Sequence, residues 1–237
     1  MRYRPLLGVL GTAGVFTLAI PLVLQSEGGA SHRQATVPFK DARLELEYNA
    51  TDGDAVLQVF VDAEEWKSFE IRTPSGKQIV DLEATGVLED FGLTELFSES
   101  SEPPFAELPF SEFKKLFPAG NYRFSGETID GRRLRATVPF SHSVLAAPRF
   151  LAPTDGGTLP AGHAVIRWAP VRGAQSYEVI VTREGPLRVL DVRLAGNDTS
   201  LTVPAEFLDK GVEYKIEIHA ADKTGNRIFT EVGFTPV

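Results

Sequence analysis

Apolar and polar residues alternate along most of the second half of the chain. The alternating apolar positions are Ala164, Ile166, Trp168, Tyr177, Val179, Val181, Leu201, Val203, Tyr214, Ile216, Ile218 and Ala220. Because successive side chains of a β-strand point to opposite faces, a period of two places these residues on one face of each strand. Clusters of Gly, Pro, Asn and Asp separate the runs. The pattern predicts several short strands in an antiparallel β-sandwich.

Residues 35–142 carry a similar but weaker pattern. Leu44 and Leu46 alternate with polar residues, whereas the apolar residues of 56–61 fall on both faces, which is typical of a buried strand. Two hairpins are predicted at the turn sequences of residues 73–76 and 130–131. We expect a second sandwich here, diverged from the one that follows it.

An apparent internal repeat connects the two regions. Phe113, Gly120, Tyr122, Gly131 and Phe140 are echoed by Phe207, Gly211, Tyr214, Gly225 and Phe234. The interval from the later glycine to the last phenylalanine is nine residues in both sets. The repeat favours two related sandwiches in tandem over one split domain. Residues 146–153, which contain two prolines, are the expected joint, a restricted hinge.

Four residues of the second half carry a resemblance to a known family. Trp168, Tyr177, and the pair Leu208 and Tyr214 resemble the core Trp, the Tyr of the next strand and the Leu and corner Tyr of a fibronectin type III domain. The resemblance covers roughly residues 147–237 and implies the fold, with these four side chains in the core, but it does not identify a ligand. Residues 222–226 read Asp-Lys-Thr-Gly-Asn where some members carry Arg-Gly-Asp, so integrin binding does not follow.

The start of the chain predicts export. Arg2 and Arg4 precede an uncharged stretch at residues 5–24, and small residues follow at 28–30. Residues 1–30 therefore form either a cleaved signal peptide or an N-terminal membrane anchor. In both cases the remainder is expected to be extracytoplasmic: periplasmic, secreted, or anchored to the membrane through residues 5–24 alone.

The fold class expected from these features is all-β. It consists of two tandem immunoglobulin-like or fibronectin type III-like β-sandwiches, at residues 35–145 and 147–237, after an N-terminal hydrophobic helix. The chain has no cysteine, which excludes disulfides, thiol nucleophiles and zinc-cysteine sites and suits a bacterial envelope. A net charge of -8 argues against nucleic acid as a partner.

Residues 87–117 are the most unusual stretch of the first region, because phenylalanines are interleaved with acidic residues and no Lys or Arg occurs before Lys114. We expect Leu88, Phe91 and Leu96 to share one helical face, and residues 111–116 to form a second short helix. In one interpretation the aromatic side chains close an edge of the sandwich. In the other they form a docking patch for another envelope or extracellular protein. The candidate residues of that patch are Phe91, Phe97, Phe105, Glu95 and Glu99.

No reaction centre is recognisable in the sequence. The four histidines are dispersed, and no metalloprotease, nucleophile-elbow or phosphate-loop motif occurs. His219, which alternates with Ile218, is expected on the solvent face of its strand. Acidic residues around Gly53 lack the distal bidentate acid of a calcium loop. We therefore predict no enzyme, no cofactor and no metal; an enzyme whose site gathers residues from both domains stays a minor alternative.

The predicted function is an exported, non-catalytic tandem β-sandwich protein of a bacterial cell envelope that mediates protein contacts or acts as a spacer. The alternative is a carbohydrate-binding or accessory module with a polysaccharide as its partner. Such a module needs a planar row of exposed Trp or Tyr side chains. Trp66 is the candidate for that role, and a place in the core is its other interpretation.

Overall fold

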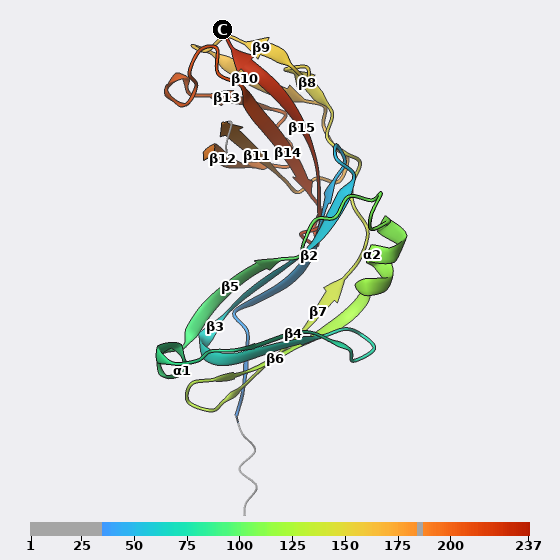
Figure 1. Cartoon of the computed structure of the whole chain (residues 1–237), viewed down its shortest axis with the longest axis vertical. Helices are drawn as coiled ribbons and strands as arrows, with labels where there is room; N and C mark the ends of the chain where they lie inside the picture. The colour runs from blue at the N-terminus through green and yellow to red at the C-terminus, as the bar shows by residue number, and fades with distance from the viewer. Residues whose placement is uncertain (1–34, 184–186) are drawn as a thin grey trace, which may run out of the picture. The chain divides into compact units, whose positions relative to one another are not determined.

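A computed structural model describes residues 35–183 and 187–237, which are mostly β-strand (Figure 1). The predicted hydrophobic helix and the signal peptide or anchor of residues 1–30 lie outside the described residues. Within the described residues, no helix is long and apolar enough to cross a membrane.

One half of the described chain precedes the predicted joint. Its elements are β1 (Thr36–Pro38), β2 (Asp41–Asn49), β3 (Asp54–Arg72), β4 (Gln78–Glu83), α1 (Val87–Phe91), β5 (Leu93–Glu99), α2 (Phe110–Leu116), β6 (Gly120–Thr128) and β7 (Arg133–Phe140). β3 is the central strand. Its first part pairs with β2 on one side and β5 on the other, and its last part pairs with β4 and β6.

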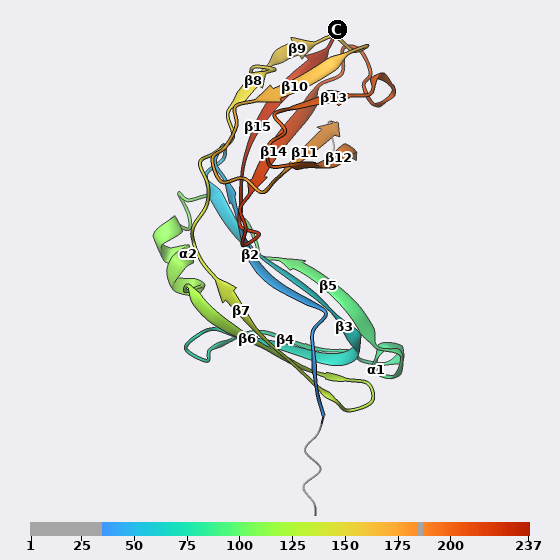
Figure 2. The ribbon, with the colours of Figure 1, turned by 180° about the vertical axis from the view of Figure 1, so that it is seen from behind.

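The other half follows the joint. Its elements are β8 (Phe150–Ala152), β9 (Gly157–Leu159), β10 (Ala164–Trp168), β11 (Ser176–Arg183), β12 (Leu187–Ala195), β13 (Ser200–Val203), η1 (Ala205–Phe207), β14 (Tyr214–Ala221) and β15 (Arg227–Pro236). β8, β10 and β13 form a three-stranded antiparallel sheet, which Figure 2 shows from the other side. β12 was not predicted from the sequence.

A parallel strand pair joins the sheets of the two halves. Residues 227–229 at the start of β15 lie opposite residues 47–49 at the end of β2. The strands β3, β2, β15, β14, β11 and β12 therefore follow one another in a single hydrogen-bonded sheet. This continuity gives the sheet two faces that run from one half into the other.

The alternation of side chains assigns opposite characters to these two faces. One face carries Leu44 and Leu46 on β2 and Ile216 and Ile218 on β14, all at most 3% exposed. These residues belong to two hydrophobic clusters, one in each half, and Tyr48 lies against both. The other parity of the same strands is charged. It includes Glu45 and Glu47 of β2 and Glu217 and His219 of β14.

The four residues behind the family resemblance lie in the second cluster. Trp168 and Tyr177 are at most 1% exposed, and their ring centroids are 5.3 Å apart. The backbone N–H of Asp209 donates to the hydroxyl of Tyr214 at 2.9 Å, and Leu208, directly before it, is 6% exposed. The hydroxyl thus holds the connection that precedes its strand, as the corner tyrosine of the resemblance implies.

Both predicted hairpins are present, as β3–β4 and β6–β7. The repeat has a structural counterpart in the pairs Tyr122 with Phe140 and Tyr214 with Phe234, whose ring centroids are 5.8 and 5.7 Å apart. The hydroxyl of Tyr122 also holds its preceding loop, donating to the carbonyl of Pro118 at 2.9 Å.

The prediction of a helical face through Leu96 was wrong. Helix α1 ends at Phe91 and is followed by Gly92, whose φ of 82° favours glycine, and the chain continues as strand β5. A Cβ at Gly92 would also lie 2.7 Å from the Cβ of Glu65. The helix is therefore restricted to one turn, and Leu96 lies opposite Val61 of β3. The second short helix was placed correctly, as α2.

The predicted joint is not the only connection between the halves. Asn226, 2% exposed in the loop between β14 and β15, accepts a hydrogen bond from the N–H of Leu46 at 2.9 Å. Its amide donates to the carbonyls of Ser141 and Ser143 at 3.0 and 2.9 Å. One side chain therefore ties β2, the chain that leaves β7, and the second half together.

We predict that Asn226→Ala lowers the free energy of unfolding by about 2 kcal/mol, because the buried N–H of Leu46 loses its acceptor. Chemical denaturation of purified protein measures the effect. Asn121→Ala, at an exposed position, is the matched control and should change little. Equal stability of the two variants would contradict the role of Asn226.

Candidate functional site

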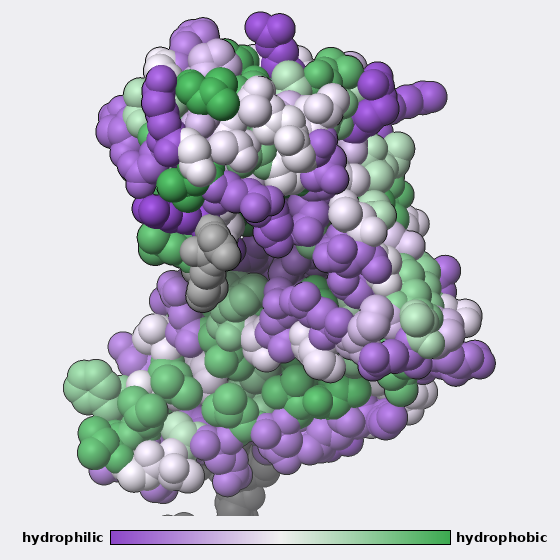
Figure 3. Space-filling model, turned by 45° about the horizontal axis from the view of Figure 1, so that its top comes forward, coloured by the Kyte–Doolittle hydropathy of each residue, from purple (hydrophilic) through white to green (hydrophobic). Residues whose placement is uncertain are grey.

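The charged face of the continuous sheet lines a cavity of about 510 Å³. β2, β3, β11, β14 and β15 supply most of its wall. The rest comes from β5 with the chain after it, from the turn between β2 and β3, and from β12. Hydrophilic side chains gather around a hollow on this face in the space-filling view (Figure 3). Because both halves contribute residues, the cavity exists only where β15 pairs with β2.

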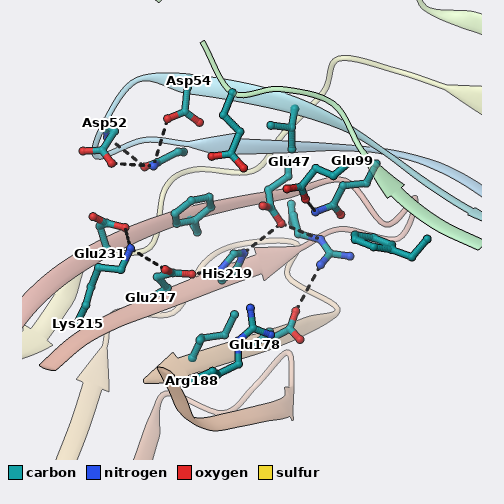
Figure 4. Close-up of a pocket in the computed structure, with 18 residues that line it drawn as sticks. Glu47, Asp52, Asp54, Glu99, Glu178, Arg188, Lys215, Glu217, His219 and Glu231 are labelled. Atoms are coloured by element: carbon teal, nitrogen blue, oxygen red, sulfur yellow. Dashed lines mark hydrogen bonds and ion pairs between the residues drawn. The ribbon is translucent and has the colours of Figure 1, made fainter. Parts of the chain in front are cut away.

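His219 lies at the centre of the cavity's ionic network (Figure 4). Its Nε2 is 3.2 Å from Oε2 of Glu217, and its Nδ1 is 3.5 Å from Oε2 of Glu47. The ring of Phe229 stacks on the imidazole with centroids 4.4 Å apart. Burial alone would lower the pKa of His219, but the hydrogen bond with Glu217 and the negative charge of Glu47 raise it above its usual value.

The prediction that His219 faces solvent was wrong, since it is 4% exposed. Its parity on the strand was assigned correctly, because Ile218 belongs to the hydrophobic cluster on the opposite face. Burial comes from β2 and β15, whose residues Glu47 and Phe229 lie against the imidazole. The alternation of residues along a strand predicts only the face on which a side chain lies. Whether that face is exposed to solvent depends on residues that are distant in the sequence.

Lys215, two residues before Glu217 on the same face of β14, forms ion pairs within the same network. Its Nζ lies 2.9 Å from Oε1 of Glu217 and 2.9 Å from Oε2 of Glu231. Burial raises the pKa of Glu217, but the hydrogen bonds from His219 and Lys215 outweigh it and set that pKa at about 2. Burial lowers the pKa of Lys215, and the hydrogen bonds with Glu217 and Glu231 raise it to about 12. Both groups are therefore charged at neutral pH.

Arg227 connects the two halves electrostatically. Its Nη2 lies 2.9 Å from Oε2 of Glu45 on β2, and its Nη1 lies 3.4 Å from Oε2 of Glu178 on β11. The side chains of Arg227 and Glu45 are only 18% and 9% exposed. A charge pair with so little exposure is costly to break by removing one partner, because the other charge then stays buried and unpaired.

Negative charge nevertheless exceeds positive charge in the cavity. Its described lining includes eight carboxylates against the three cations Arg188, Lys215 and Arg227. Partial burial of its carboxyl group, a hydrogen bond with Glu99 and the charge of Glu99 raise the pKa of Glu102 to about 7. Burial and the charge of Asp52 likewise raise the pKa of Asp54. These two raised pKa values mark the part of the cavity where the negative charge is least compensated.

The excess of carboxylates gives this arrangement an attraction for positive charge. No Ser, Thr, Tyr or Cys lines the cavity among the described residues, so it offers no hydroxyl or thiol nucleophile. Lys215 is protonated and paired, and His219 lies between two carboxylates. In the described parts of the chain, no group of three or more His, Cys, Asp or Glu side chains is arranged to hold a metal ion.

The loop considered for calcium has a different role in the structure. The side-chain amide of Asn49 donates to Asp52 at 3.3 Å and to Asp54 at 3.5 Å. Its carbonyl oxygen accepts from the backbone N–H groups of Thr51 and Asp52 at 2.9 and 3.1 Å. Asn49 therefore holds the turn between β2 and β3 through its own side chain.

The residues predicted for a docking patch fall into two groups. Phe91 and Phe97 are 75% and 61% exposed, and Glu95 and Glu99 are exposed beside them on β5. Phe105 is instead half-buried, with its ring 5.2 Å from that of Tyr48 and 5.7 Å from that of Phe110. Phe105 thus closes an end of the first cluster, whereas Phe97 and Glu99 also line the cavity.

Trp66, the candidate for stacking on a sugar, is 1% exposed and packs 6.0 Å from the ring of Phe69. Trp168 is buried as well. The described tyrosines are either buried or, in the case of Tyr48, half-buried against Phe105 and Phe110. The described surface therefore lacks the planar row of exposed Trp or Tyr side chains that a carbohydrate-binding module needs.

We predict that His219→Gln lowers the free energy of unfolding by roughly 2 kcal/mol at pH 6 and by less at pH 9. The pKa of His219 is higher in the folded chain than its usual value of 6.5, which applies to the unfolded chain. Protonated His219 therefore stabilises the fold fully below about pH 6.5, and this stabilisation is lost as pH rises through the folded pKa. Denaturation at several pH values measures it, with the exposed His163→Gln as control. If the difference in free energy of unfolding between variant and wild type did not decrease as pH rises, a stabilising protonated His219 would be contradicted.

Glu102 also makes stability fall as pH rises, but here the charged form of the side chain is the unfavourable one, so removing its charge should stabilise the fold at high pH. Its usual pKa of 4.5 applies to the unfolded chain, so between about 4.5 and 7 the folded chain binds more protons than the unfolded one and stability falls as pH rises. We expect Glu102→Gln to raise the melting temperature at pH 8 and to leave it unchanged at pH 4. The effect should be small because Glu102 is exposed, and Glu107→Gln, at another exposed acid, should lack it. If both variants changed the melting temperature by the same amount at each pH, the raised pKa of Glu102 would be contradicted.

The comparisons with known proteins concern the fold. No family model matches the chain, and no curated protein matches it. It is similar to a two-domain fibronectin type III segment of chicken tenascin, with 13% sequence identity and a TM-score of 0.31 over 83% of this chain and 98% of that chain. It is also similar to the fibronectin(III)-like modules of Clostridium thermocellum CbhA, with 10% identity and a TM-score of 0.33 over 84% and 92% of the two chains. Both of these solved structures are fibronectin type III segments.

Proposed function

We propose that this chain is an exported, non-catalytic protein of a bacterial cell envelope that binds another envelope or extracellular protein. In this proposal residues 1–30 act as a signal peptide or membrane anchor, and two tandem immunoglobulin-like sandwiches form the exported part. Support for export comes from the sequence, through Arg2, Arg4 and the uncharged residues 5–24.

The observation that carries the proposal is an exposed apolar segment at α1 and β5. Val87, Leu88, Phe91 and Phe97 are 82%, 43%, 75% and 61% exposed. Large apolar side chains gathered on a surface mark an interaction site more often than isolated ones do. We call these four residues the apolar segment.

The charge around the apolar segment indicates what kind of protein it meets. Residues 87–113 contain no Lys or Arg, and exposed carboxylates accompany the apolar side chains. Glu89 and Asp90 lie beside Phe91, and Glu95 and Glu99 flank Phe97. An acidic rim around apolar side chains steers a basic partner toward the site and repels an acidic one.

The cavity supports a non-catalytic role. Lys215, His219 and Arg227 are engaged in ion pairs, and the described lining offers no hydroxyl or thiol nucleophile. A spacer role needs only the junction between the halves and would leave the exposure of Phe91 and Phe97 without a purpose. Binding is therefore the better supported of the two functions.

We expect the double variant Phe91→Ala and Phe97→Ala to lose most capture of its partner, by at least tenfold, while its melting temperature changes little. Crosslinking and pull-down from the native cell envelope measure capture, and calorimetry measures stability. Phe207→Ala, which removes another exposed phenylalanine in the other half, is the matched control. A fall in melting temperature with unchanged capture would show that the apolar segment only closes the fold.

A further inference from the structure

Strand β5 lies at an open edge of the sheet. It pairs with β3 along one side, and no other strand within residues 35–183 and 187–237 pairs with it. An open edge presents backbone N–H and C=O groups that can pair with another chain. Natural edges are commonly protected by charged side chains, proline or a covering loop. β5, with the sequence Leu-Thr-Glu-Leu-Phe-Ser-Glu, contains no proline or lysine, and its only charges are the two glutamates.

The register shows which backbone groups of β5 point outward. Beyond the end of β5, the N–H of Ser100 donates to the carbonyl of Leu57 at 3.0 Å, so Ser100 faces β3. The backbone N–H and C=O groups of successive residues point to alternate sides of an antiparallel strand, so those of Ser98 and Leu96 also point toward β3. The N–H and C=O groups of Glu95, Phe97 and Glu99 therefore point away from β3, toward the open edge.

The side chains of these three residues share one face of the sheet. Phe97 lies opposite Phe60, Glu95 lies opposite Asp62, and Glu99 accepts a hydrogen bond from the side-chain amide of Gln58 at 2.6 Å. It is the charged face of the sheet, since Phe97 and Glu99 also line the cavity. A chain added along β5 would therefore place every second side chain on this acidic face.

Charge decides which chain can be added there. A second copy of β5 would bring Glu95 and Glu99 close to their own equivalents, and like charges on neighbouring strands are destabilising. A strand with basic residues at alternate positions would pair with these carboxylates and lie next to Glu102, where the negative charge of the cavity is least compensated. Its remaining residues would face the other side of the sheet.

We propose that β5 binds an extended, basic segment of the partner protein as an added β-strand. The proposal rests on the proposed function and specifies it. Main-chain hydrogen bonds to Glu95, Phe97 and Glu99 supply affinity, and the carboxylates with the Phe97 ring supply specificity. The partner is recognised by an unpaired segment in which lysine or arginine alternates with β-branched residues.

Amide hydrogen exchange followed by NMR tests the mode of binding directly. The probe is a synthetic peptide in which lysine alternates with valine, added to the full exported part of the chain. We expect the outward amides of Glu95, Phe97 and Glu99 to exchange at least tenfold more slowly at saturation, whereas the inward amides of Leu96 and Ser98 are slow from the start. Binding that leaves the outward amides unchanged, or no binding of the peptide, overturns strand addition.

Two further peptides serve as matched controls without altering the protein. In one peptide the backbone nitrogens of the lysines are methylated, and in the other those of the valines. Because only every second N–H of an added strand points toward β5, only one of the two peptides loses the donors that pair with β5. We expect one methylated peptide to bind at least fivefold more weakly than the other, since each lost main-chain hydrogen bond contributes about 1 kcal/mol. Equal binding by both peptides overturns the proposal.

The outcomes separate this inference from the proposed function. If envelope capture depends on Phe91 and Phe97 but the outward amides stay unprotected, the partner docks through side chains and strand addition is wrong. If capture is independent of both phenylalanines, the proposed function fails by itself. A dimer of the chain that disappears in Phe97→Ala, seen by sedimentation, would show that a second copy occupies β5 and would overturn the basic partner.

Discussion

The parallel pairing of β15 with β2 is the constraint on which the rest of the structure depends. It joins two sheets that would otherwise end at separate edges, and Asn226 secures it from within by satisfying the N–H of Leu46 and two carbonyls of the chain after β7. Arg227, the next residue, adds ion pairs to Glu45 and Glu178 on either side. These contacts give the halves a second connection besides the proline-containing linker.

Continuity of the sheet explains why charged residues are gathered in one place. Each strand has one apolar and one polar face, and joining the halves aligns the polar faces into one surface. Residues such as His219 and Glu217 then lie among the side chains of neighbouring strands instead of in water, so each must have a partner of opposite charge. The network of His219, Lys215 and Arg227 satisfies most of this requirement. The carboxylates left in excess near β5, Glu99 and Glu102, give the cavity its attraction for cations.

Strand β5 connects the apolar segment to this cavity. Phe97 belongs to both, since its ring is 61% exposed and it lines the cavity together with Glu99, which accepts a hydrogen bond from Gln58. Residues 87–117 divide between two roles: Phe105, Phe110, Phe113 and Phe117 pack on the first hydrophobic cluster, whereas Phe91 and Phe97 stay exposed. Closing an edge thus applies to the packed phenylalanines, and the exposed pair is left for the proposed partner.

The sequence by itself determined the features that depend on neighbours within one strand or one turn. Alternation placed Ile216, Ile218 and Tyr177 on the core face, turn residues located both hairpins, and the spacing of Leu208 and Tyr214 identified the corner. Only the tertiary structure decided that His219 is buried, that Leu96 lies on a strand and that Asn226 holds the halves together. The contacts responsible join residues as far apart as Leu46 and Asn226, or Glu47 and His219. Local periodicity records which face a residue occupies, and what covers that face depends on how segments distant in the chain meet.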